Sequence, residues 1–243
     1  MDVEFPFSPL EQAVRIEHLV MQEDKRLYSR FRASNYHGGI ATADVVGCSF
    51  LCAYCWSYDR CLRPEPEDMF YSPQTVAVKL LNVARTCSYN MYCLSGSEPL
   101  LGEGSFEHMI QVVKTLIRYR PNAIFILETN GFFLGYNPEF IQRLKIPNLR
   151  VRVCLKGIDE KSFETISGAE REYFSFPFTA LKELQKAGIT AWPALMGDFY
   201  RENEVMEFQL KLKTQKISED LELENLEAYP PVVGNLKKRK IEF

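Results

Sequence analysis

The sequence predicts an α/β fold, namely an incomplete and open barrel of the TIM type, with about six βα units and a short N-terminal helical extension. Two observations support this prediction. Short apolar runs alternate with helical patterns along most of the chain, which is typical of parallel βαβ units. The chain has 243 residues, and the part from Cys48 onward is too short for eight units, since a closed barrel takes about 250 residues.

The apolar runs are the predicted strands, and the segments of helical periodicity between them are the predicted helices. The strands cover 41–47, 91–94, 123–128, 149–155, 189–195 and 221–228. The helices cover 73–85, 106–118, 138–144, 176–187 and 202–213. Ser72 and Pro73 form a favourable N-cap and first turn, and Gly188 stands where a helix-ending glycine belongs.

The first 40 residues are predicted to form an extension outside the barrel. Ser8, Pro9 and Glu11 have the order of an N-cap, a first-turn proline and a capping-box residue, so we expect a helix that reaches about Asp24. Residues 25–39 are expected to be an irregular polar lead-in to the first strand. The expected division is therefore 1–40 as helical extension, 41–229 as the barrel and 230–243 as a basic C-terminal tail.

Composition and charge exclude several classes of protein. The chain is 46% hydrophobic and 25% charged, which is typical of a globular domain and not of a disordered or fibrous chain. Its formal net charge of -3 argues against general nucleic-acid binding, and we expect the basic run 236–240 to be a solvated terminus. There is no basic leader, and no apolar run approaches the roughly 18 residues of a membrane span. We expect a soluble, cytoplasmic protein that binds no membrane, and the charge balance disfavours nucleic acid as a partner.

Three of the seven cysteines stand at the spacing of a metal-binding loop. Cys48, Cys52 and Cys55 form a CxxxCxxC motif directly after the first predicted barrel strand. Thiolates so close in sequence can converge on zinc or on an iron–sulfur cluster. A zinc site or an electron-transfer cluster with four protein ligands requires a fourth residue. The candidates for it are Cys61, Cys87, Cys93 and Cys154, although Cys93 and Cys154 are expected to be small core residues.

The cysteine spacing, with the aromatic residue Tyr54 directly before the third cysteine, resembles the radical S-adenosylmethionine (radical SAM) superfamily. The next predicted strands end in further similar motifs. Gly96-Ser97-Glu98-Pro99 resembles the superfamily's Gly-Gly-Glu-Pro segment, with Ser97 in place of the second glycine. Glu128-Thr129-Asn130-Gly131 and Cys154-Leu155-Lys156 resemble elements of the glycyl-radical activating enzymes, such as the pyruvate formate-lyase activating enzyme. Cys154 stands where that branch has an aspartate that helps to hold a monovalent cation.

The resemblance implies two cofactors, a [4Fe-4S] cluster and SAM. Cys48, Cys52 and Cys55 would bind three irons, and the amine and carboxylate of SAM would chelate the fourth. An electron from the cluster would then cleave SAM and give a 5′-deoxyadenosyl radical that abstracts hydrogen from a substrate. The implied SAM-binding residues are Tyr54, Gly96, Ser97, Glu98, Glu128, Asn130, Lys156 and Met196. Among them, Glu98 would orient the amine, Asn130 and Lys156 the ribose and carboxylate, and Tyr54 the adenine.

The resemblance leaves the substrate open. A protein glycine, as in the activating enzymes, is one possibility, and a small metabolite, a cofactor precursor or an RNA is another. The implied protein partner is an electron donor such as flavodoxin or ferredoxin. From the cysteines alone, a non-catalytic iron–sulfur electron carrier and a zinc-binding module remain alternatives.

Overall fold

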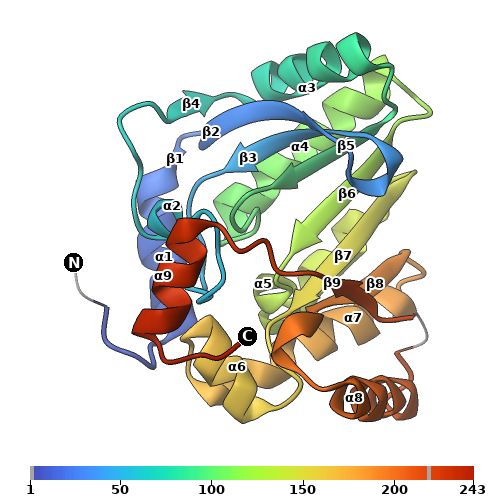
Figure 1. Ribbon diagram of the computed structural model, residues 1–243. Coiled ribbons are helices and arrows are strands. Elements are labelled where there is room, and N and C mark those ends of the chain that lie inside the picture. The colour runs from blue at the N-terminus through green and yellow to red at the C-terminus, as the bar shows by residue number, and fades with distance from the viewer. Residues whose placement is uncertain (1–2, 218–219) are drawn as a thin grey trace.

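The protein is described by a computed structural model that covers residues 3–217 and 220–243; residues 1–2 of the predicted extension lie outside the described residues. In the described part, nine strands form one sheet in the order β1-β2-β3-β5-β6-β7-β8-β9, and β4 pairs with β2 (Figure 1). The parallel strands are β3 (Ile40–Val45), β5 (Met91–Ser95), β6 (Ile124–Thr129), β7 (Leu149–Leu155), β8 (Ala191–Met196) and β9 (Glu222–Glu224). They correspond to the six predicted strands. Within the described residues the two edges of the sheet do not pair with each other, so the predicted open barrel is confirmed.

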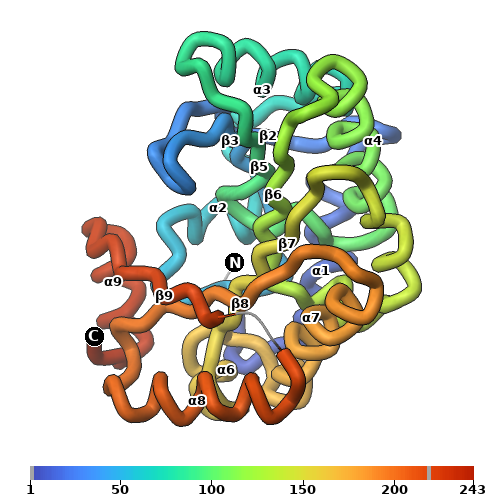
Figure 2. Tube along the Cα trace, turned by 90° about the vertical axis from the view of Figure 1, so that its right-hand side faces the viewer, coloured from blue at the N-terminus to red at the C-terminus, as the bar shows by residue number. Residues whose placement is uncertain are grey.

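All five helices predicted between the strands are also confirmed. They are α3 (Pro73–Cys87), α4 (Glu103–Tyr119), the 3-10 helix η2 (Pro138–Leu144), α7 (Phe176–Lys186) and α8 (Glu202–Thr214). Figure 2 shows α4 and α7 on the outer side of the sheet, whereas the segment around β9 lies on the inner side. Three short helices, too short to show a clear periodicity, were missed: α2 (Tyr58–Leu62), α5 (Phe132–Tyr136) and α6 (Glu160–Ser167). Within the described ranges, none of the helices has the length and apolarity needed to cross a membrane.

Alternation of side chains along the parallel strands separates a packed outer face from a polar inner face. On the outer face, Leu94, Leu127 and Val153 are fully buried in one apolar core with residues of α3, α4 and α7. On the inner face, the neighbouring positions are polar and line a cavity; among them are Thr42, Ser95, Glu128 and Arg152. Since the interior of a closed barrel is normally filled by branched apolar side chains, this polar interior indicates a binding site.

The extension departs from the expectation for 25–39. Helix α1 (Pro9–Val20) begins at the predicted cap, where Ser8 Oγ accepts a hydrogen bond from the Glu11 backbone at 3.4 Å. The expectation of an irregular lead-in is wrong, because β2 (Lys25–Ser34) is a long strand antiparallel to β3. It also pairs with the short strands β1 (Met21–Gln22) and β4 (Met69–Tyr71). The sequence hides β2 because its inner face meets the polar cavity, so the strand lacks an apolar pattern.

The C-terminal segment is not the solvated tail expected from its charge. Helix α9 (Pro230–Lys238) buries Val232 and Leu236 against Ala53 in the cysteine loop. Arg239, just beyond the helix, donates a hydrogen bond to the carbonyl oxygen of Leu51 at 2.7 Å. Lys237 and Lys238 are exposed to solvent. In the sequence these lysines obscure the apolar stripe through which the helix packs.

Candidate functional site

The cysteine loop leaves the carboxyl end of β3 at Gly47. This glycine has a φ of +92°, and a Cβ atom there would collide with α1, so both its backbone and its surroundings require glycine. The backbone N–H groups of Leu51 and Ala53 donate to the carbonyl oxygens of Ser167 and Ile166, both at 2.9 Å. The loop is therefore held in shape by the end of α6.

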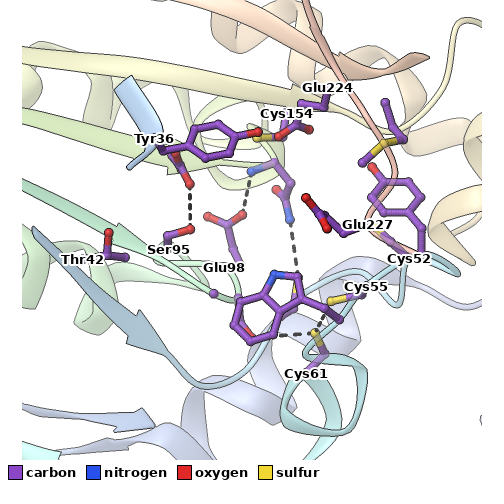
Figure 3. Close-up of a pocket in the computed structure, with 18 of the residues that line it drawn as sticks. Tyr36, Thr42, Cys52, Cys55, Cys61, Ser95, Glu98, Cys154, Glu224 and Glu227 are labelled. Atoms are coloured by element: carbon purple, nitrogen blue, oxygen red, sulfur yellow. Dashed lines mark hydrogen bonds between the residues drawn. The ribbon is translucent and has the colours of Figure 1, made fainter. Parts of the chain in front are cut away.

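The three predicted cluster ligands lie on the wall of one cavity of about 840 Å³. Cys52 is buried, and Cys48 and Cys55 are half-buried. Figure 3 shows Cys52 and Cys55 on one side of this cavity, with Thr42 and Ser95 on the other. Cys48 Sγ accepts a hydrogen bond from the Phe50 backbone at 3.4 Å. Three thiols on one wall, with space in front of them, are a donor set that fits an iron–sulfur cluster with an open iron.

Cys61 lies beside this set and lines the same cavity. Its Sγ atom is 3.7 Å from Cys55 Sγ and 3.8 Å from Ser97 Oγ, and the residue is 1% exposed. The hydrogen bond from Cys61 lowers the pKa of Cys55 to about 6, whereas donation to Cys48 and Cys55 raises the pKa of Cys61 itself. Among the described residues, no three His, Cys, Asp or Glu side chains are gathered as ligands of a single metal ion. Cys61 is therefore a hydrogen-bonded neighbour of Cys55, one of the three predicted cluster ligands.

Glu98 connects the ends of two strands. Its Oε1 atom accepts hydrogen bonds from the Thr129 hydroxyl at 2.6 Å and from the Leu100 backbone at 3.0 Å, and its Oε2 atom accepts the Asn130 backbone N–H at 2.7 Å. Burial raises the pKa of Glu98 to about 7 even though these hydrogen bonds lower it. The fully buried Arg26 donates to the Glu98 carbonyl oxygen at 2.7 Å, a contact that the sequence did not reveal. The carboxylate thus lines the cavity and shapes the loop after β6.

The segment between β5 and Glu98 is joined to the cysteine loop through Ser57. The Ser57 hydroxyl donates to the carbonyl oxygen of Gly96 at 2.5 Å and lies 3.3 Å from Ser97 Oγ. Gly96 has a φ of +87°, and a Cβ atom there would lie 2.8 Å from Asp44 Cβ. Glycine is therefore required at the first position of this motif, whereas Ser97 fits at the second because its hydroxyl meets Ser57.

Tyr54 and Lys156 meet on another wall of the cavity. Lys156 Nζ donates to the Tyr54 hydroxyl at 3.1 Å, and the Tyr54 ring stacks on Phe199 with centroids 5.4 Å apart. Met196, at the end of β8, lines the same cavity. Phe199 follows the fifth predicted strand, and its part in this aromatic pair had no signal in the sequence.

Glu128 and Asn130 lie at the end of β6. Glu128 Oε2 accepts the Ser95 hydroxyl at 2.6 Å, and its Oε1 atom is 3.6 Å from His37 Nε2. Burial alone would raise the pKa of Glu128, but His37 and Arg152 lower it overall. The Asn130 side chain donates to Ser49 Oγ at 2.9 Å, so this asparagine braces the cysteine loop.

Sequence reasoning missed two clusters of charged residues around the inner face. Asp44 on β3 is 1% exposed and accepts hydrogen bonds from Arg30 and Arg32 of β2. On the far side, Arg152 pairs with Glu222 and Glu224, each at 2.8 Å. Arg30 and Arg32 are two residues apart, a spacing that places both side chains on the same face of a strand. This spacing could be interpreted only once residues 25–34 were known to form a strand.

The expectation that Cys154 is a core thiol is also wrong. Cys154 is half-buried and lines the cavity, and its Sγ atom accepts a hydrogen bond from Arg152 at 3.2 Å. Cys93 also lines the cavity, but it is 2% exposed and packs against Ile40 and Ile126, as expected of a small buried residue.

Comparison with known proteins supports the superfamily that the cysteine spacing resembles. The family model of the Radical SAM superfamily matches residues 44–208, which is more than half of the chain. GTP 3′,8-cyclase from Microcystis aeruginosa is 23% identical over 143 residues, which cover 58% of this chain and 41% of that protein. The chain therefore spans less than half of the length of this curated relative.

Solved structures show the same fold. SuiB from Streptococcus suis, bound to S-adenosylmethionine, superposes with a TM-score of 0.56 at 15% identity, over 80% of this chain and 44% of SuiB. The structure of native anSMEcpe with bound AdoMet gives a TM-score of 0.53 at 16% identity, over 76% of this chain and 53% of that one. At these identities the likeness establishes the fold alone.

Proposed function

Because this chain belongs to the radical SAM superfamily, we propose that it is an enzyme that abstracts a hydrogen atom from an organic substrate. Members of this superfamily bind a [4Fe-4S] cluster and SAM. When bound, the reduced cluster cleaves SAM reductively and supplies a 5′-deoxyadenosyl radical as the hydrogen acceptor. The observation that carries the proposal is the convergence of Cys48, Cys52 and Cys55 on one cavity that Glu98 and Asn130 also line.

The three cysteines would hold the cluster, and the surrounding chain would control its environment. The backbone contacts between the cysteine loop and α6 fix the loop, and Asn130 braces it through Ser49. Cys61 and Ser57 both lie within hydrogen-bonding distance of Cys55 Sγ. Such contacts to a ligand sulfur influence the reduction potential of a cluster.

The walls of the cavity would hold SAM. Gly96 and Ser97 would lie beside the methionine amine, and Glu98 would act mainly by positioning the strand ends, since its oxygens already accept three hydrogen bonds. Lys156 would meet the carboxylate or ribose, Glu128 the ribose, and the Tyr54–Phe199 pair, with Met196, the adenine. With Cys154 in place of an aspartate, we propose no monovalent cation site.

Anaerobic reconstitution followed by reduction with dithionite tests the proposal. We expect about four iron and four sulfide per chain, and release of 5′-deoxyadenosine and methionine from SAM. Cys48→Ala should lose both the iron and the SAM cleavage, whereas Cys87→Ala, a control at an exposed thiol, should retain them. Iron without SAM cleavage in the wild type would indicate an electron carrier, and zinc without sulfide a zinc-binding module.

We further propose that the electron comes from a flavodoxin or ferredoxin and that the substrate is a small molecule. The cavity has the volume of a ligand site, and its inner face is polar and charged, which suits a small polar substrate. Activation of a protein glycine is a second hypothesis, suggested by the motifs that resemble the activating enzymes. Neither the family match nor the relatives select that branch. A radical signal on a partner protein after turnover would favour it.

A further inference from the structure

Two arginines of β2 share one carboxylate on the inner face of the sheet. Arg30 and Arg32 are two residues apart, so both side chains lie on the same face of the strand, and both line the cavity. Arg30 Nε donates to Asp44 Oδ2 at 2.5 Å, and Arg32 binds the same carboxylate through Nε at 2.8 Å and Nη2 at 3.1 Å. Asp44 neutralises one of the two guanidinium groups, so this side of the cavity keeps one positive charge.

Arg30 is oriented although its side chain is about half exposed. Asp44 holds its Nε edge, and its guanidinium carbon lies 4.9 Å from the centroid of the Trp56 ring. Among the described residues, its hydrogen bonds use only Nε, so both terminal Nη groups are available to a ligand. A planar guanidinium with a free edge binds carboxylate and phosphate groups through paired hydrogen bonds.

The opposite side of the cavity has the opposite charge. Arg152, which is 2% exposed, is bound by the carboxylates of Glu222 and Glu224, so it has no charge left for a ligand. Glu128 and Glu227 add two further carboxylates to the same cavity. Figure 3 shows Glu224 and Glu227 across the cavity from Thr42 and Ser95. Lys156 also lines the cavity, but we place it at SAM, so the positive charge left for an anionic group of the substrate lies on the β2 side.

The position of Trp56 connects this positive side to the reaction centre. Trp56 directly follows Cys55 in the cysteine loop and contacts Arg30 through its ring. A group bound by Arg30 would thus lie beside the loop that holds the cluster, as a substrate must if its hydrogen is to be removed there. Arg30 comes from the antiparallel strand β2 and not from a parallel strand.

From these contacts we propose that Arg30 and Arg32, with Trp56, form an oxyanion subsite that binds the carboxylate or phosphate group of a small substrate. The inference rests on the proposed function, since it names the substrate class for the same cavity. Asp44 is a positioning residue in this subsite, because it orients both guanidinium groups without facing the ligand.

Anion binding by the cluster-loaded protein, measured by calorimetry under anaerobic conditions, tests the subsite. The titrations use saturating SAM and no reductant, with glutarate and pyrophosphate as separate probes for a carboxylate and a phosphate. We expect one probe to bind with a Kd below about 1 mM, and Arg30→Gln to weaken it by about ten- to a hundredfold. Arg30→Lys, which keeps the charge but not the planar fork, should bind with intermediate affinity. Arg118→Gln, on the exposed face of α4, is the matched control and should bind as the wild type does.

Each outcome decides the proposal. Binding of neither probe, or equal binding by the wild type and Arg30→Gln, would overturn it. Binding of a probe only in a parallel titration without SAM would also overturn it, because the arginines would then hold SAM instead. Thermal unfolding verifies that both Arg30 variants fold. We expect them to fold because Arg32 still pairs with Asp44. The measurement involves no turnover, so failure of this subsite is distinguishable from failure of the proposed SAM cleavage, which the reductive assay of the wild type tests separately.

Discussion

The backbone N–H of Asn130 donates to Glu98 Oε2 at 2.7 Å, so one buried carboxylate ties the carboxyl end of β6 to that of β5. The other carboxylate oxygen, Oε1, accepts hydrogen bonds from the Thr129 hydroxyl and the Leu100 backbone N–H. The two strand ends therefore keep their relative position through Glu98, at the place where we propose that SAM binds.

Glu98→Gln should lower the free energy of unfolding by about 1–3 kcal/mol. The glutamine amide has only one acceptor oxygen, so its NH2 group must take the place of the other carboxylate oxygen. In one orientation the NH2 group would face the Asn130 N–H, and in the other it would face the donors of Thr129 and Leu100. Urea unfolding measures the change, and Glu139→Gln, at an exposed position, is the control. Equal unfolding midpoints for Glu98→Gln and the wild type would contradict the connecting role of this carboxylate.

His108 should make the fold sensitive to acid. Its Nδ1 atom donates to the Asp24 carbonyl oxygen at 2.7 Å, and its Nε2 atom accepts the Tyr28 hydroxyl at 2.9 Å. Burial lowers the pKa of His108 to about 4 from its ordinary value of 6.5. Between these values the unfolded chain binds a proton that the folded chain does not. The free energy of unfolding should therefore fall as the pH drops from 6.5 to 4, by at most about 1.4 kcal/mol per pH unit.

Unfolding midpoints of the wild type and His108→Gln across this pH range isolate the contribution of His108. The variant should be less stable at pH 7 but should lose less stability on acidification. Parallel pH profiles for the two proteins would show that His108 is not the group responsible.

Cys61→Ala should leave the cluster in place. Although Cys61 Sγ lies only 3.7 Å from Cys55 Sγ, we propose Cys48, Cys52 and Cys55 as the ligands, so iron and sulfide content and SAM cleavage should persist. The reduction potential, measured by spectroscopic titration, should become more negative because a hydrogen bond to a ligand sulfur is lost. Loss of the cluster from Cys61→Ala, comparable with the loss from Cys55→Ala, would instead identify a site with four cysteine ligands.

Arg239→Ala should loosen the cysteine loop. Arg239 donates to the carbonyl oxygens of Leu51, Thr165 and Ile166 and covers the Phe5 ring at 4.5 Å. Without it these carbonyl groups lose a charged donor, so amide hydrogens of residues 50–54 should exchange faster and reconstituted iron should be lost sooner. Lys237→Ala, at an exposed position of α9, is the matched control and should change neither quantity.

Local pattern was sufficient for the parallel strands and for the cysteine loop. β3, β5, β6, β7 and β8 each have a short apolar run because the outer face of the strand packs against helices, and this periodicity is visible within a single segment. The CxxxCxxC spacing likewise lies within eight residues, so its potential to bind a cluster can be read without knowledge of the fold. The number of βα units could be predicted from the length of the chain after Cys48.

Only the tertiary structure decided what surrounds that loop. β2 has no apolar pattern because its inner face meets charged partners, and Arg30 acquires its role only through Asp44 on β3 and Trp56 in the loop. Glu98 and Asn130 are 32 residues apart, and Arg239 and Leu51 are 188 residues apart. The sequence by itself determined the six parallel strands and the cysteine motif, because those depend on neighbouring residues. The charged cavity and the docking of the C-terminal helix depend on contacts between distant segments, which exist only once the sheet has formed.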